Sequence, residues 1–172
     1  MRSLVAFVAL IALANGVLAI SPVPRKSPDF TVVEVSGKQT PLSSLKGKVV
    51  MIEFLLTNCP HCQRVSQTIN RLHKELGPRG FHPMGVAFNT DVSERMVTDY
   101  VQRFAVTYPV GYSSPQAVDT YLGRSAMERL MVPQIVVIDR QGVIRAQGGP
   151  KGDPNLEDEN YLRTLIESLL RE

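Results

Sequence analysis

A chain of 172 residues that is 44% hydrophobic is long enough to bury the core of one α/β domain and short for two. Charged residues make up 20% of the chain, and the formal net charge is +3. Because both signs of charge are interspersed and no basic run occurs, this composition argues against a disordered chain and against a nucleic-acid partner.

The first twenty residues have the pattern of a secretory leader. Arg2 supplies a positive charge, residues 3–20 are uncharged, and the tripeptide Val-Leu-Ala at 17–19 has the small-x-small form that signal peptidase accepts. We therefore expect residues 1–19 to be a signal peptide. The alternative is an uncleaved anchor, since the uncharged run approaches the ~20 residues that cross a bilayer. Both interpretations predict a periplasmic or secreted domain, in a compartment where disulfides persist.

Residues 20–29 carry three prolines and two basic side chains, which is typical of an extended linker. The domain itself is expected over 30–172. It begins with a predicted strand over 30–35, a turn at Gly37-Lys38 and a short turn-like segment over 42–45.

Residues 49–56 are an almost continuous apolar run, which predicts a central strand covered on both faces. One acid, Glu53, interrupts the run, and a lone carboxylate is costly to bury without a partner. Residues 60–76 have apolar side chains at spacings of three and four, which predicts a helix that stops at Gly77-Pro78. Cys59 lies at the start of this helix.

A second helix is predicted over 93–104, with Ser93 as its N-cap. Its buried side is expected to carry Met96, Tyr100, Val101 and Phe104. The other predicted elements are a strand over 81–88, a short strand over 110–112, a short helix over 116–123, a hairpin of 135–139 and 143–147, a loop over 148–155 and a closing helix over 157–170. Strands that alternate with helices and end in a hairpin predict an α/β fold with a central mixed sheet and helices on both faces.

Two cysteines separated by Pro60 and His61 could act as redox partners or as metal ligands. A tetrahedral zinc site needs four ligands, and the three histidines of the chain do not have the spacing of a second ligand pair. A structural disulfide is a weak explanation, because so short a loop removes little entropy from the unfolded chain. We therefore predict a redox-active Cys59–Cys62 disulfide that needs no cofactor or metal.

The position of the pair on the helix predicts a role for each residue. The Cys59 sulfur would face the free N–H groups of a helix N-terminus, which favours the thiolate, so Cys59 is the predicted nucleophile. Cys62, one turn into the helix, would attack the mixed disulfide and release the partner. Pro60 suits the first turn because its missing N–H would be unpaired there. His61 could donate a hydrogen bond or a positive charge to the thiolate and raise the reduction potential, or it could be an exposed helix residue.

Three motifs carry a resemblance to a known family: Leu-Ser-Ser-Leu-Lys-Gly-Lys at 42–48, the CxxC at 59–62 and Val-Pro-Gln at 132–134. Over residues 28–170 the chain resembles the thioredoxin superfamily, and within it the extracytoplasmic TlpA/ResA-like thiol-disulfide oxidoreductases with a redoxin-type N-terminal segment. The resemblance implies a thioredoxin-like fold with an N-terminal β extension.

The resemblance also implies a substrate-binding surface. Pro133 would be a cis-proline that faces the cysteine pair, and Val132 would present backbone groups to a substrate peptide. Pro60 would complete this surface. The alternative for Pro133 is a trans proline that enters a strand.

Glu53 lies six residues before Cys59, where thioredoxin and DsbA-like proteins carry a buried acid. By the same resemblance it would accept and return the proton of Cys62, and burial should raise its pKa toward neutrality. The alternative is a glutamate that reaches solvent or pairs with Lys48.

The chain departs from this family at two positions. Asn58 replaces the usual tryptophan before the first cysteine, so the apolar recognition surface is altered. Val65 stands where ResA-like proteins carry a glutamate, which weakens a specific role in cytochrome c maturation. The Pro-His dipeptide is that of DsbA-type oxidants, but the inserted helical domain of DsbA is missing, so the direction of electron flow stays open.

Three functions are compatible with these patterns. The favoured one is dithiol/disulfide exchange with protein thiols and disulfides outside the cytoplasm, with a membrane or extracytoplasmic redox partner and membrane attachment only if the leader is retained. A peroxiredoxin-like peroxidase is the second, because Thr57 lies close before the first cysteine, although Ile52 and Leu56 do not fit the peroxidase pattern. A Cu(I)-binding module for oxidase maturation is the third; His82 and Met84 could be proposed as extra ligands, but the favoured interpretation of both is as ordinary strand residues.

Overall fold

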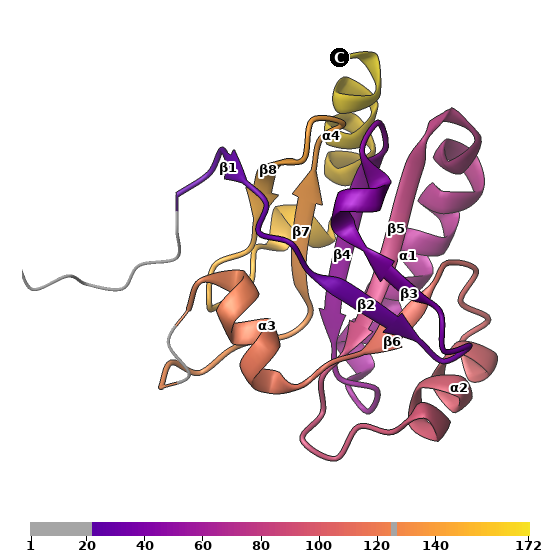
Figure 1. The fold of residues 1–172 in the computed structure, drawn as a ribbon. Coiled ribbons are helices and arrows are strands. Elements are labelled where there is room, and N and C mark those ends of the chain that lie inside the picture. The colour runs from indigo at the N-terminus through magenta and orange to yellow at the C-terminus, as the bar shows by residue number, and fades with distance from the viewer. Residues whose placement is uncertain (1–21, 125–126) are drawn as a thin grey trace, which may run out of the picture.

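The computed structural model describes residues 22–124 and 127–172, which form a mixed sheet between helices (Figure 1). The strands are β1 (Arg25–Lys26), β2 (Thr31–Glu34), β3 (Gln39–Pro41), β4 (Val49–Leu55), β5 (Phe81–Ala87), β6 (Val110–Tyr112), β7 (Gln134–Ile138) and β8 (Val143–Gln147). The helices are α1 (Pro60–Leu76), α2 (Glu94–Arg103), α3 (Pro115–Leu122) and α4 (Glu159–Arg171), with short 3-10 turns η1 (Leu42–Leu45), η2 (Gly77–Arg79) and η3 (Pro154–Glu157). The strand order is β1-β8-β7-β4-β5-β6-β2-β3, in which β4 pairs in parallel with β5 and β5 with β6. The signal peptide expected over 1–19 lies outside the described residues.

The central strand β4 joins the two halves of the core, because all seven of its residues are buried and successive side chains point to opposite faces of the sheet. Met51 and Leu55 pack with residues of α1, α2 and α4 in one cluster. Ile52 and Phe54 pack on the opposite face with residues of α3. The predicted mixed sheet with helices on both faces is therefore confirmed (Figure 1).

The main differences from the predicted elements lie at the N-terminus. Strand β3 has no counterpart among them, because three residues carry no periodic pattern; the turn at Gly37, with φ +80°, folds it against β2. Strand β1 lies inside the segment expected to be a linker, and its Arg25 pairs with Ile144 of β8. Hydrogen-bonded sheet structure therefore begins before residue 30.

Two helices differ in detail from expectation. Helix α2 is capped as predicted, since the Ser93 hydroxyl accepts a hydrogen bond from the N–H of Met96 (3.4 Å). Of the expected buried side, Tyr100 is buried and the half-buried Val101 and Phe104 pack against the core. The expectation was wrong at Met96, which is half-buried, because Val97 takes the fully buried place. Helix α4 begins two residues later than expected, after Asp158, whose carboxylate caps it.

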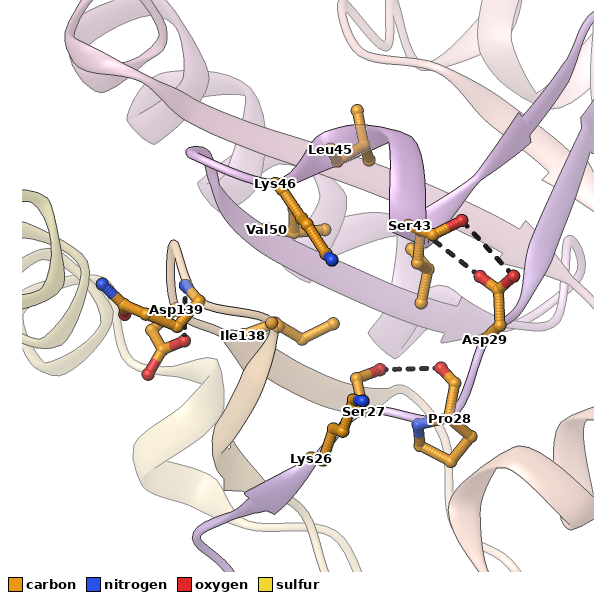
Figure 2. Close-up of a pocket in the computed structure, with 13 residues that line it drawn as sticks. Lys26, Ser27, Pro28, Asp29, Ser43, Leu45, Lys46, Val50, Ile138 and Asp139 are labelled. Atoms are coloured by element: carbon orange, nitrogen blue, oxygen red, sulfur yellow. Dashed lines mark hydrogen bonds between the residues drawn. The ribbon is translucent and has the colours of Figure 1, made fainter.

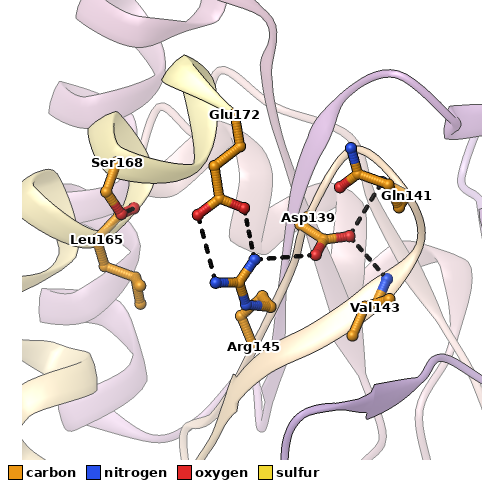
Figure 3. Close-up of polar contacts among 7 residues, drawn as sticks. All are labelled: Asp139, Gln141, Val143, Arg145, Leu165, Ser168 and Glu172. Atoms are coloured by element: carbon orange, nitrogen blue, oxygen red, sulfur yellow. Dashed lines mark hydrogen bonds and ion pairs between the residues drawn. The ribbon is translucent and has the colours of Figure 1, made fainter.

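A buried acid fastens the β7–β8 hairpin at its turn (Figure 3). Oδ1 of Asp139 accepts hydrogen bonds from the N–H groups of Gln141 (3.0 Å) and Val143 (2.9 Å). Its Oδ2 pairs with Arg145 (3.2 Å), which also pairs with Glu172 (2.6 Å) at the end of α4. These contacts join the hairpin to the last helix.

The topology brings separate segments together at the carboxyl end of β4. Residues 56–59 connect β4 to α1, so Cys59 lies directly beyond the strand. Strand β7 is antiparallel to β4, with Gln134 opposite Phe54, so the segment that precedes β7 arrives at the same end. This is the end at which open α/β sheets bind ligands. Among the helices of the described residues, none is long and apolar enough to cross a membrane.

Candidate active site

The cysteine pair lies at the N-terminus of α1. Cys59 is the N-cap residue, and its sulfur accepts a hydrogen bond from the backbone N–H of Cys62 (3.3 Å). Cys59 is partly exposed, whereas Cys62 is fully buried. Helix N–H groups stabilise negative charge on the accessible sulfur. Cys59 is therefore the sulfur that an incoming disulfide can reach.

Cys62 is held as a thiol by its surroundings. Burial raises the pKa of this thiol well above its ordinary value, and the hydrogen bond with Cys59 and the charge of Glu53 add to the effect. A backbone hydrogen bond with Leu56 lowers the same pKa. Cys62 can act as a nucleophile only when a base removes its proton.

Glu53 on β4 provides a buried carboxyl beside the pair. Its side chain is 0% exposed, and its Oε2 accepts hydrogen bonds from Ser66 Oγ (2.8 Å) and Tyr108 OH (2.9 Å). Burial raises the pKa of this carboxyl from 4.5 to about 7, although the two hydrogen bonds lower it. The alternative in which Glu53 reaches solvent or pairs with Lys48 is therefore wrong. A carboxyl with this pKa can take up and release a proton near neutral pH.

Three residues of this site were not identified from the sequence. Ser66 lies four residues after Cys62 on the buried face of α1, so a serine on an apolar helix face was the available signal. Tyr100 was expected to be buried but had no assigned partner; its hydroxyl lies 2.7 Å from Ser66 Oγ. Tyr108 comes from the loop before β6, and no local pattern links it to Glu53.

Asn89 fixes the loop that carries Cys59. Its Oδ1 accepts a hydrogen bond from the N–H of Thr57 (3.1 Å), and its Nδ2 donates to Oδ1 of Asn58 (3.3 Å). Gln63 on α1 donates to the Thr57 carbonyl (3.3 Å). The Thr57 hydroxyl, which motivated the peroxidase hypothesis, also donates to Asn89 (3.4 Å). Thr57 and Asn58 thus hold the loop in position for Cys59.

The peptide bond that precedes Pro133 is cis, as the resemblance implied. The carbonyl oxygen of Val132 lies 4.0 Å from the Cys59 sulfur, so this loop borders the reactive atom. Gln134, buried at the start of β7, donates from Nε2 to the carbonyl of Met131 in this loop (2.7 Å) and to the carbonyl of Gly149 in the loop after β8 (3.0 Å). Gln134 therefore holds the loop in place from inside the protein.

His61 has a carboxylate partner that the sequence did not indicate. Its Nε2 lies 2.7 Å from Oε2 of Glu157, at the end of η3. The hydrogen bonds found for the Cys59 sulfur in the described part involve Cys62 and Val132. The stabilisation of the Cys59 thiolate by His61 therefore stays a prediction.

The extra ligands suggested for Cu(I) are on the wrong face of the sheet. Met84 on β5 packs with Ile52 in the cluster on the α3 face, whereas Cys62 packs in the cluster on the α1 face. His82 shares the face of Met84, because the two residues are separated by one position on the strand. Across residues 22–124 and 127–172, no group of three or more His, Cys, Asp and Glu side chains is arranged to hold a metal ion.

A cavity of about 320 Å³ lies at the opposite end of β4 from the cysteines (Figure 2). It is enclosed by residues 26–29, η1 and the β7–β8 turn, and Val50 and Ile138 contribute apolar side chains to it. Asp29 at its edge accepts hydrogen bonds from the N–H and the hydroxyl of Ser43 (3.3 and 3.4 Å). The cavity is formed where the N-terminal segment crosses the sheet, and the cysteine pair does not line it.

Comparison with known proteins agrees with this geometry. A family model described as Redoxin matches residues 22–165. The thiol-disulfide oxidoreductase ResA of Bacillus thuringiensis subsp. konkukian is 25% identical over 143 residues, which cover 82% of this chain and 77% of that protein. The thioredoxin-like protein YneN of Bacillus subtilis is 25% identical over 122 residues, which cover 70% and 68%.

Solved structures are similar to this chain in fold. The thioredoxin-family thiol:disulfide interchange protein of Chlorobium tepidum superposes with a TM-score of 0.70 at 25% identity, over 87% of this chain and 99% of that one. This similarity confirms the expected thioredoxin-like fold. The chain therefore belongs to the redoxin family, as a homologue of the ResA thiol-disulfide oxidoreductases that carries a CxxC pair at Cys59 and Cys62.

Proposed function

We propose that this protein exchanges its Cys59–Cys62 dithiol or disulfide with protein thiols and disulfides outside the cytoplasm. One arrangement carries the proposal: a partly exposed Cys59 sulfur caps α1, with a buried Cys62 thiol and a buried Glu53 carboxyl of raised pKa behind it. These groups provide the nucleophile, the resolving thiol and the base that dithiol exchange requires.

In the first step, the Cys59 thiolate attacks one sulfur of a substrate disulfide. A bond forms between Cys59 and that sulfur, and the substrate disulfide breaks. The second substrate sulfur leaves as a thiolate with the electron pair of the broken bond. Helix N–H groups, among them that of Cys62, stabilise the charge on Cys59 before the attack.

In the second step, Cys62 resolves the mixed disulfide. Glu53 takes the proton of the Cys62 thiol, and the Cys62 sulfur attacks Cys59 and displaces the substrate as a second thiolate. The substrate has gained two electrons and the protein has lost two. The same steps run in reverse when the oxidised protein meets a reduced substrate, so the reduction potential decides the direction.

The substrate surface belongs to the loop around Pro133. The Val132 carbonyl lies beside Cys59, and Pro60 follows Cys59 directly at the first position of α1. A peptide next to Cys59 can donate a backbone N–H to this carbonyl, which is recognition of main chain rather than of a particular sequence. His61, which is paired with Glu157, is proposed to stabilise the Cys59 thiolate and so raise the reduction potential of the cysteine pair.

The location is proposed from the leader pattern over residues 1–19. In an oxidising compartment, the CxxC pair requires an extracytoplasmic or membrane redox partner to restore its working state. Fractionation of cells that express the full chain tests this, together with sequencing of the mature N-terminus. We expect the protein outside the cytoplasm, either cleaved after Ala19 or attached to the membrane; a cytoplasmic protein would contradict the location.

Insulin reduction driven by dithiothreitol tests the activity itself. The wild type should accelerate the reduction, and Cys59→Ser should abolish the acceleration because it removes the attacking sulfur. Asp139→Asn is the matched control, since Asp139 lies at the far end of β7 from the cysteines. Acceleration by Cys59→Ser equal to that of the wild type would contradict the proposal.

A further inference from the structure

Hydroxyl groups from several elements surround the Glu53 carboxyl. Ser66 comes from α1, Tyr100 from α2 and Tyr108 from the loop before β6, and each is at most 4% exposed. Ser66 Oγ and Tyr108 OH lie 2.8 and 2.9 Å from Oε2, and Tyr100 OH lies 2.7 Å from Ser66 Oγ. We call these four residues the Glu53 cluster.

The hydrogen bonds of the Glu53 cluster are one-sided. Oε2 accepts both hydrogen bonds that the carboxyl receives, whereas Oε1 is buried and has no hydrogen-bond partner among the described residues. A serine hydroxyl has one hydrogen, and Ser66 gives it to Oε2, so Tyr100 must be the donor to Ser66. Two hydroxyl hydrogens are therefore donated to Oε2 and the third, that of Tyr100, to Ser66 Oγ, so Oε1 is the oxygen left to carry the proton of the neutral acid.

We infer that Ser66 and Tyr108 are positioning residues that keep Oε2 as an acceptor and reserve Oε1 for the proton of Cys62. The inference rests on the proposed function and deepens its second step. In that step the S–H bond of Cys62 breaks and its proton moves to Oε1, while the sulfur attacks Cys59 with its electron pair. The Cys59–Cys62 bond forms, the bond between Cys59 and the substrate breaks, and the substrate thiolate takes a proton from solvent.

The hydrogen bonds from Ser66 and Tyr108 are what lowers the pKa of Glu53, because the other groups around the carboxyl bring no positive charge to it. Among the described residues, the titratable groups that interact with the charge of this carboxyl are Cys62 on α1, Tyr100 on α2 and Tyr108. Its register partners on β5 and β7 are Gly85 and Ile135, and the buried residues of α4 are apolar, so these elements bring no cation to it. Burial raises the pKa of Glu53, and the bonds from Ser66 and Tyr108 lower it. Loss of either hydroxyl should therefore raise this pKa.

The reagent 5,5′-dithiobis(2-nitrobenzoate) separates the two steps, because attack by Cys59 releases one coloured thiolate and resolution by Cys62 releases a second. In the reduced wild type the rate of the second release should rise with pH around a midpoint near 7, since the ionised Glu53 is the base. Tyr108→Phe and Ser66→Ala each remove only a hydroxyl group. Each should raise this midpoint by about one pH unit and slow the second release about tenfold at pH 6. The pH profile of the first release should stay unchanged.

Tyr121→Phe is the matched control, because Tyr121 is 3% exposed and its hydroxyl pairs with Ser27 (3.0 Å) on the opposite face of the sheet. It should keep the wild-type midpoint. A wild-type midpoint in both Tyr108→Phe and Ser66→Ala, or an equal shift of both releases, would overturn the inference. A wild type that releases only one thiolate would instead contradict the proposed function.

A second measurement does not depend on exchange. A ¹³C NMR titration of the Glu53 carboxyl in the reduced protein should give a higher midpoint in Tyr108→Phe than in the wild type. The Tyr121→Phe variant should titrate as the wild type does. Equal midpoints in Tyr108→Phe and the wild type would overturn the inference.

Discussion

Replacing Glu53 by glutamine removes a buried ionisable group and nearly preserves its shape. The carboxyl has a pKa of about 7 in the folded protein and an ordinary value of 4.5, so the folded state binds its proton more tightly than the unfolded chain does. Glu53 therefore contributes stability that is fully present below about pH 4.5 and is lost as the pH rises through about 7. Glutamine has no such dependence.

The size of this effect follows from the two pKa values. They differ by 7 − 4.5, or about 2.5 units, and each unit corresponds to about 1.4 kcal/mol, so the loss is about 3 kcal/mol above pH 8. The side chain is 0% exposed, so solvent screening does not reduce this value. The stability of Glu53→Gln relative to the wild type should therefore improve by about 3 kcal/mol between pH 4 and pH 8.5.

Urea denaturation of both reduced proteins at pH 4 and pH 8.5, followed by circular dichroism, measures this difference. Other titrating groups are common to the two proteins and cancel in the comparison. If the free energies of unfolding of the two proteins change in parallel between these pH values, to within about 0.5 kcal/mol, Glu53 does not titrate near neutrality. Its role as the base for Cys62 would then be untenable.

Three further substitutions test other parts of the site. Gln134→Ala removes one hydrogen bond to Met131 in the loop before β7 and one to Gly149 in the loop after β8. It should lower the free energy of unfolding by about 1–3 kcal/mol in urea titrations and slow exchange; unchanged exchange kinetics would argue against its role in holding the loop before β7. Asp139→Ala breaks the turn contacts at the far end of β7 (Figure 3) and should lower the free energy of unfolding by about 2 kcal/mol in urea titrations. The rate of attack by Cys59 should stay unchanged; a slower attack would contradict the independence of the β7–β8 turn from the cysteine site. His61→Ala should lower the reduction potential against glutathione by less than about 30 mV, equivalent to about 1.4 kcal/mol, because the imidazole is paired with Glu157 rather than with the Cys59 sulfur; a larger fall would show that His61 acts directly on Cys59.

The parts of the site that could be predicted are those with a local pattern. The spacing of Cys59 and Cys62, the helical periodicity that follows and the apolar run that precedes them all lie within one short stretch of chain. Glu53 was identifiable because it is a single charge inside that apolar run. The strand β1 was not, because two residues carry no periodicity and their pairing with β8 depends on the folded sheet.

The partners of these residues depend on tertiary packing. Tyr108 reaches Glu53 from 55 residues further along the chain, and its position depends on how the loop before β6 packs. Glu157 meets His61 only because η3 is folded back toward the start of α1. Local patterns therefore indicated the cysteine pair and the buried acid, whereas the side chains that contact them could be found only in the structure.

Trapping of a mixed disulfide tests most directly whether Cys59 attacks and Cys62 resolves. Reduced Cys62→Ser, mixed with a disulfide-bonded protein substrate, should form a covalent adduct through Cys59 that persists until dithiothreitol is added, because no thiol remains to resolve it. Reduced Cys59→Ser should form none, because Cys62 is buried and keeps its proton. An adduct that forms with Cys59→Ser and not with Cys62→Ser would reverse the two roles, and the absence of an adduct from both would contradict the exchange mechanism itself.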